Sequence, residues 1–107
     1  MSTFSVLMVE PNKQPYITQI KNDIQTFENL VHGPVDMQRF YQSPYLILCN
    51  TDNGYNLKYL KLLPDHPFFI AKYDGEFQNI ERLETEQLRM YLKEKMKKWS
   101  IHKKRTN

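Results

Sequence analysis

Few residues in this chain have types that could support catalysis or metal binding. The single cysteine, Cys49, lies in an apolar run, where an inert buried thiol is more common than a nucleophile. The histidines His32, His66 and His102 are far apart in the sequence and share no metal-ligand spacing. The sequence therefore predicts no catalytic residue, no metal site and no cofactor.

Acidic residues near His66 offer one alternative chemistry. Asp65, Asp74 and Glu76 could form the metal-binding cluster of a small nuclease, although acidic residues in loops are usually only solvated. The chain has no glycine-rich phosphate loop, because its three glycines are isolated and each is explained by a turn. A non-enzymatic protein is the favoured interpretation, and a nuclease is the least favoured.

The strongest chemical signal is the basic C-terminal end. Residues 88–107 contain eight basic residues and one acidic residue, whereas residues 1–87 contain seven and eleven. A basic end on an acidic body is typical of proteins that bind nucleic acid or an acidic partner. A solvated helix face is the open alternative. The candidate contacts are Arg89, Lys93 and Lys97, on the helix face opposite the apolar stripe, and Lys98, Lys103, Lys104 and Arg105.

A second candidate surface combines tyrosines with lysines. They are interleaved between residues 55 and 73, a pattern that could stack bases and contact phosphates. The favoured interpretation is simpler: such residues fill exposed strand faces. The candidates retained for nucleic-acid or partner binding are Tyr55, Lys58, Tyr59 and Lys61.

Length and composition predict one globular domain. A chain of 107 residues with 40% apolar and 25% charged residues can bury one modest core. We expect this domain over residues 1–99, with a flexible basic tail over 100–107. No apolar stretch approaches the roughly 18 residues of a membrane span, the first residues lack a secretory signal, and one cysteine suits a reducing compartment. These features predict a cytoplasmic protein that does not enter a membrane.

Apolar patterning predicts a mainly antiparallel sheet of four to five strands. The run Tyr45–Cys49 is apolar throughout and bounded by turn residues, so we expect a strand covered on both faces. Residues 35–42 alternate as its half-buried neighbour, and Thr3–Val9 is a second interior strand. We expect further strands over residues 16–20, 55–63 and 68–73, with a tight turn at Asn53–Gly54.

Two amphipathic helices complete the predicted α+β fold, both on one face of the sheet. In the first, Ile24, Phe27, Leu30 and Val31 share an apolar face, with Asn22 or Asp23 as N-cap and Gly33 as the C-terminal cap. Thr85 is the expected N-cap of the second helix. Its apolar stripe contains Leu88, Tyr91, Leu92, Met96 and Trp99, interrupted by Lys95, whose ammonium must reach solvent.

The order of these features resembles a family of domains of unknown function. They include Val9-Glu10-Pro11, Gly33, Asn50 with Asn53-Gly54, Leu63-Pro64 and a Thr-capped final helix. The resemblance extends from Phe4 to Lys95 and departs from the family between Pro64 and Phe68. The family is common in phages and plasmids of Gram-positive bacteria, and such domains occur in small inhibitors of type II CRISPR nucleases.

The resemblance implies a non-enzymatic anti-CRISPR protein in the cytoplasm of a bacterial host. Its partner would be a type II CRISPR nuclease, the guide RNA of that nuclease, or both, and it would block assembly of the complex. The acidic body could mimic nucleic acid, or the basic helix could compete for RNA, and the sequence leaves both open. A general nucleic-acid-binding accessory of a plasmid or phage is the alternative function.

Overall fold

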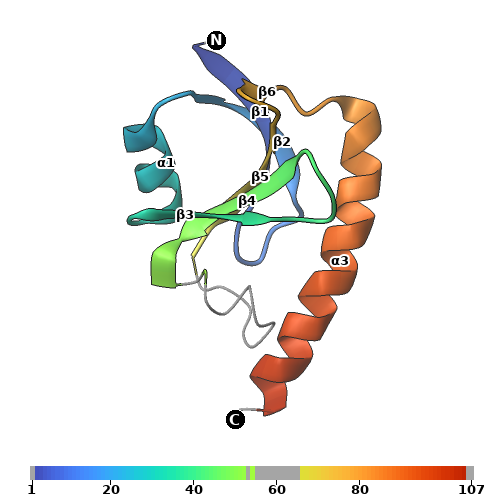
Figure 1. The fold of residues 1–107 in the computed structure, drawn as a ribbon. Helices are drawn as coiled ribbons and strands as arrows, with labels where there is room; N and C mark the ends of the chain where they lie inside the picture. Colours follow the sequence, from blue (N-terminus) through green and yellow to red (C-terminus); the bar gives the residue numbers. More distant parts are fainter. Residues whose placement is uncertain (1, 53, 55–65, 106–107) are drawn as a thin grey trace.

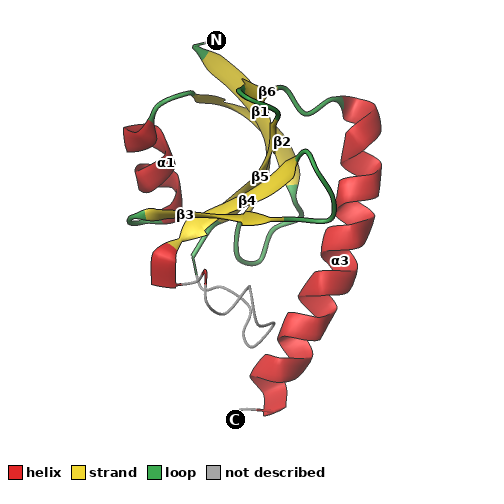
Figure 2. Cartoon of the chain, in the orientation of Figure 1, coloured by secondary structure: helices red, strands yellow, loops and turns green. Residues whose placement is uncertain are grey.

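Six strands form one antiparallel sheet in the computed structural model, and a short helix and a long helix pack against it (Figures 1 and 2). This count refers to residues 2–52, 54 and 66–105, which are the ones that the structure describes. The elements are β1 (Thr3–Val9), β2 (Tyr16–Lys21), α1 (Ile24–Val31), β3 (Val35–Arg39), β4 (Tyr45–Asn50), β5 (Phe68–Tyr73), β6 (Phe77–Gln78) and α3 (Arg82–Arg105).

The strand order is β2-β1-β5-β4-β3, with β6 paired to β5 as well. Strands β1 and β4 therefore lie inside the sheet, as the sequence predicts, and β2 and β3 are its edges. β5 pairs with β1 through residues 68–70 and with β6 through residues 72–73. The α+β fold is confirmed, and the sheet is larger than the four to five strands expected, since it includes β6, where no strand is expected from the sequence.

The two helices cover opposite faces of the sheet, so the prediction of one shared face is wrong (Figure 1). On β1, Phe4, Val6 and Met8 pack with buried residues of α1, whereas Leu7 and Val9 pack with buried residues of α3. Because strand side chains alternate between faces, a strand that is apolar at successive positions needs cover on both. One helix on each face supplies it.

Helix α1 begins as predicted but turns its first residue to solvent. The Asp23 side chain is the N-cap and accepts a hydrogen bond from the Thr26 N–H at 2.7 Å. Phe27 is buried, but Ile24 is 62% exposed, so its expected place in the core is wrong. The residue in the left-handed conformation after the helix is His32, with φ 65°, rather than the expected Gly33.

Helix α3 begins one turn earlier than predicted. Its first residue is Arg82, and the Glu81 N–H donates to the Glu84 carboxylate at 2.7 Å, as in a capping box. Thr85 is therefore not the N-cap, and its hydroxyl donates to the Glu81 carbonyl inside the first turn. The helix continues through residues 100–105, which the sequence predicts as a tail.

The segment after β4 differs from the predicted hairpin turn. Thr51, Asp52 and Gly54 are helical, and Gly54 does not have the positive φ that a type I′ turn requires. Asn53 and the strand expected over residues 55–63 lie outside the described residues.

Candidate nucleic-acid interface

The outer face of α3 carries three of the predicted basic residues. Arg89, Lys93 and Lys97 follow one another at intervals of four, so they lie on one side of the helix. Arg89 is half-buried, and Lys93 and Lys97 are exposed. We call these three residues the basic row.

Buried leucines hold the opposite side of α3 against the sheet. Leu88 and Leu92 are 1% and 0% exposed and pack with Leu7, Val9 and other residues of the α3-facing core. Lys93 and Lys97 are thereby exposed to solvent, and Arg89 is half-buried beside Leu88. The side chains of Lys98, Lys103, Lys104 and Arg105 lie outside the part of the chain that the structure describes, although the backbone at these positions is helical.

The cations of the basic row have no ionic partner within the described part of the chain. The ion pairs found there join Lys13 to Glu10 and Lys72 to Glu84. All three charges of the row are therefore available to an external anion. α3 is 24 residues long, about 36 Å at 1.5 Å per residue, and its C-terminal part projects beyond the sheet in Figure 1.

A carboxylate fixes the N-terminal turn of α3 to the sheet. Glu84 Oε1 accepts a hydrogen bond from the Tyr45 hydroxyl at 2.5 Å and lies 2.8 Å from Lys72 Nζ. Burial raises the pKa of Glu84, but the hydrogen bonds from Lys72, Tyr45 and the Glu81 N–H outweigh it, so the pKa lies below its ordinary value. Burial and the bond to Glu84 raise the pKa of Tyr45 to about 12. The contacts of Glu84 with Tyr45 and Lys72 therefore fix the position of the helix that carries the basic row.

Aromatic residues flank α3 where it faces the turn between β3 and β4. The Tyr91 ring lies 5.1 Å from the Phe40 ring and 4.7 Å from the Tyr41 ring, centroid to centroid. Lys95 Nζ lies 5.4 Å from the Tyr91 centroid, a cation–π contact. This contact accommodates the ammonium of a lysine that lies on the apolar stripe. Tyr41 is 44% exposed and offers a ring on which a base could stack.

Sequence reasoning missed this aromatic cluster, because 50 residues separate Tyr41 from Tyr91 and no spacing joins them. The predicted surface at Tyr55, Lys58, Tyr59 and Lys61 lies outside the described residues. Of the other residues in that pattern, Lys72 is engaged by Glu84.

Cys49 is a buried residue of the core. It is 0% exposed, and its Sγ lies 3.7 Å from the Asp36 carbonyl oxygen to which it donates. Burial raises the pKa of the thiol to about 12, so the thiolate that a nucleophile needs is not formed near neutral pH. The interpretation of Cys49 as a core residue is confirmed.

The acidic cluster of the nuclease interpretation is not brought together. His66 precedes β5, whereas Asp74 and Glu76 follow it, and a strand of six residues separates the two ends by about 20 Å. Asp65 lies outside the described residues. Within the described part of the chain, no three His, Cys, Asp or Glu side chains gather as a metal site.

His66 instead lies beside His32, 34 residues earlier in the sequence. Their Nδ1 atoms are 3.4 Å apart. Their distance in the sequence gave no sign of this contact.

The chain matches no protein-family model, no curated protein and no solved structure. None of its described helices combines the length and the apolar character needed to cross a membrane.

Proposed function

We propose that this protein is a non-enzymatic inhibitor that binds the guide RNA of a type II CRISPR nuclease and blocks assembly of the complex. The observation that supports RNA binding is the basic row, three cations without an ionic partner among the described residues, on a helix anchored by buried leucines. The resemblance described above suggests a type II CRISPR nuclease or its guide RNA as the partner, and the positive charge of the row favours the RNA.

The geometry favours phosphate contacts over base readout. Lysine and arginine side chains at helical spacing can follow a phosphate backbone without reading its sequence. Each phosphate neutralised on a single strand contributes about 0.7 to the slope of log affinity against log salt, so three contacts contribute about 2. Affinity for RNA should therefore fall steeply as the salt concentration rises.

The alternative is a general nucleic-acid-binding accessory of a plasmid or phage. The same basic row supports it, because phosphate contacts do not distinguish one RNA from another. The two functions differ in their consequence: only the inhibitor prevents the nuclease from acquiring its guide.

The experiment compares two variants of equal charge. The triple variant Arg89→Gln, Lys93→Gln, Lys97→Gln removes the basic row, and the control Lys13→Gln, Lys21→Gln, Arg39→Gln removes three cations elsewhere. Guide-RNA affinity is measured by fluorescence anisotropy over a salt series. DNA cleavage is measured with the protein added before and after the nuclease has bound its guide.

We expect the basic-row variant to bind RNA more weakly and to inhibit no longer when it is added before guide loading. Its slope of log affinity against log salt should decrease by about 2. The control should keep its RNA affinity, its slope and its inhibition. RNA binding that depends on the row without any inhibition would favour the accessory function. If the row variant binds RNA as the wild type does, the basic row is a solvated face and the proposal is wrong.

A further inference from the structure

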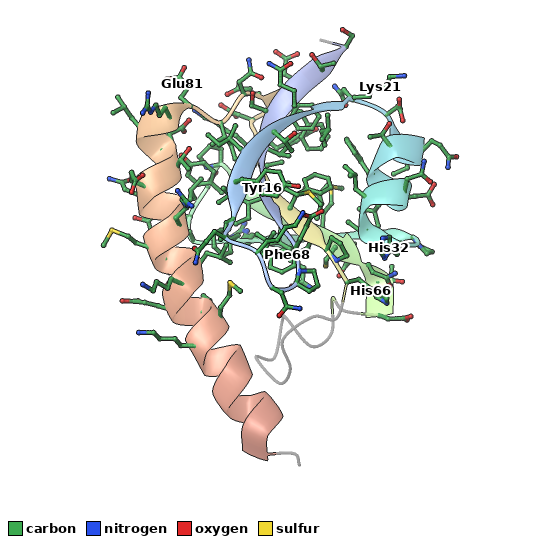
Figure 3. The ribbon with its side chains drawn as sticks, turned by 180° about the vertical axis from the view of Figure 1, so that it is seen from behind. Tyr16, Lys21, His32, His66, Phe68 and Glu81 are labelled. Atoms are coloured by element: carbon green, nitrogen blue, oxygen red, sulfur yellow. The ribbon has the colours of Figure 1, made fainter. Side chains whose placement is uncertain are left out.

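The pair His32–His66 lies at the surface, away from α3 (Figure 3). His32 is the residue that ends α1, and His66 precedes β5. Both side chains are exposed, their ring centroids are 5.3 Å apart, and the two Nδ1 atoms lie 3.4 Å from one another. The two imidazoles therefore bring the same ring nitrogen, Nδ1, close together at the surface.

Buried neighbours fix the backbone on both sides of the pair. Val31, next to His32, is fully buried, and the His32 carbonyl accepts a hydrogen bond from Asn50 Nδ2 at 2.8 Å. Asn50 is itself only 5% exposed. On the other side, Phe68 begins β5 two residues after His66 and is 3% exposed. α1, β4 and β5 thus position the backbone near both histidines.

We propose that His32 and His66 bind one zinc ion through their Nδ1 atoms. At zinc–nitrogen distances of about 2.0–2.1 Å, a tetrahedral angle places two ligand nitrogens about 3.3–3.4 Å apart. The observed separation is 3.4 Å. The right angle of a square-planar copper or nickel site would bring the nitrogens to about 2.9 Å at the same bond lengths.

The surroundings suit a cation. The C-terminus of a helix carries partial negative charge, and His32 caps that end of α1. Between two neutral imidazoles, a hydrogen bond across this distance requires one ring to carry its proton on Nδ1 and to donate it to the other. Zinc binding needs both Nδ1 lone pairs, so that proton moves to Nε2, and no net proton is released from two neutral rings. Within the described residues no third His, Cys, Asp or Glu side chain joins the pair as a ligand.

The test titrates the full chain with zinc chloride in a calorimeter. His32→Asn preserves the left-handed backbone, which asparagine tolerates, and His66→Gln keeps a polar side chain of similar length. His102→Gln is the matched control, since it removes a histidine outside the pair. Nitrogen-15 spectra of the imidazoles report which nitrogen gains the metal, and circular dichroism checks that each variant is folded.

We expect one zinc per chain and a shift of Nδ1 in His32 and His66 only. Each variant of the pair should bind zinc at least about tenfold more weakly, since even the loss of a group that only orients a ligand costs that much. His102→Gln should bind as the wild type does. Zinc binding that survives in the doubly substituted, folded chain would overturn the proposal, as would the absence of binding to the wild type at millimolar zinc.

Discussion

Removing the Glu84 carboxylate should destabilise the whole domain, because this group joins α3 to the sheet. Glu84 accepts hydrogen bonds from the Tyr45 hydroxyl and the Glu81 N–H and pairs with Lys72. A hydrogen bond to a charged group contributes about 1.5–3 kcal/mol. The Lys72 pair contributes about 0.5–1 kcal/mol, since both side chains are partly exposed. The cap adds about 0.5–1 kcal/mol.

These contributions share one carboxylate and are not strictly additive, so Glu84→Ala should cost about 3 kcal/mol. Glu84→Gln retains an acceptor for Tyr45 and loses the charge, and it should cost about 1–2 kcal/mol. For a domain of this size, 1 kcal/mol lowers the melting temperature by about 4–8 °C. Urea unfolding followed by circular dichroism measures the free energies directly.

A double-mutant cycle with Tyr45→Phe tests the reasoning further. The two substitutions should be coupled by about 1 kcal/mol or more, because each removes the same hydrogen bond. Additive effects, or a Glu84→Ala variant within about 0.5 kcal/mol of the wild type, would refute the assignment of Glu84 as the link between α3 and the sheet.

Other predictions follow from individual side chains. The folded-state pKa of Glu84 lies below its ordinary value of 4.5. The ionised carboxylate therefore stabilises the folded chain above pH 4.5, and this stabilisation is lost as the pH falls through the folded-state pKa. In urea unfolding at decreasing pH, the difference in unfolding free energy between wild type and Glu84→Gln should shrink. Leu48 is fully buried, and Leu48→Ala should cost about 2–5 kcal/mol in urea unfolding, whereas Ile24→Ala should change stability by less than about 1 kcal/mol, because Ile24 is 62% exposed. Cys49 should resist a thiol reagent at pH 8 until urea unfolds the chain, and labelling of the native protein at the rate of a free thiol would contradict its burial. Asp23→Ala should lower the free energy of unfolding by about 1 kcal/mol through loss of the N-cap, while an unchanged melting temperature would contradict that role.

Local sequence signals predicted the elements of this fold well. The apolar run of β4 and the Asp23 cap depend on residues close in the chain, and both predictions are confirmed. The prediction that both helices cover one face of the sheet was wrong. The sequence did contain the signal for two covered faces, because β1 is apolar at successive positions and such a strand needs cover on both faces. The predicted start of α3 was wrong because two neighbouring residues, Glu84 and Thr85, could each form the cap. At the cap, Glu84 bonds the Glu81 N–H, while Thr85 bonds within the helix.

The sites depend on contacts that local patterns cannot predict. The basic row was visible because helical spacing brings residues four apart to one side. The pairing of His32 with His66 arises because α1 ends beside the start of β5, and the Tyr41–Tyr91 contact arises because α3 crosses the β3–β4 turn. Both depend on sheet order, which is a property of the whole chain.

The position of β5 between β1 and β4 also sets the order in which a growing chain can fold. β1 and β2 can pair early, but the second neighbour of β1 is β5, and the stacked partner of the Phe4 ring, 4.8 Å away, is Phe77. At about 5–20 residues per second, the roughly 60 residues between β1 and β5 take about 3–12 s to synthesise. For those seconds the face of the N-terminal hairpin that carries Leu7 and Val9 stays exposed to ribosome-bound chaperones, because its partners in β5 and α3 have not been synthesised. A nascent chain halted before Phe68 has no strand to join its two hairpins, so the N-terminal half cannot mature as a separate folding unit.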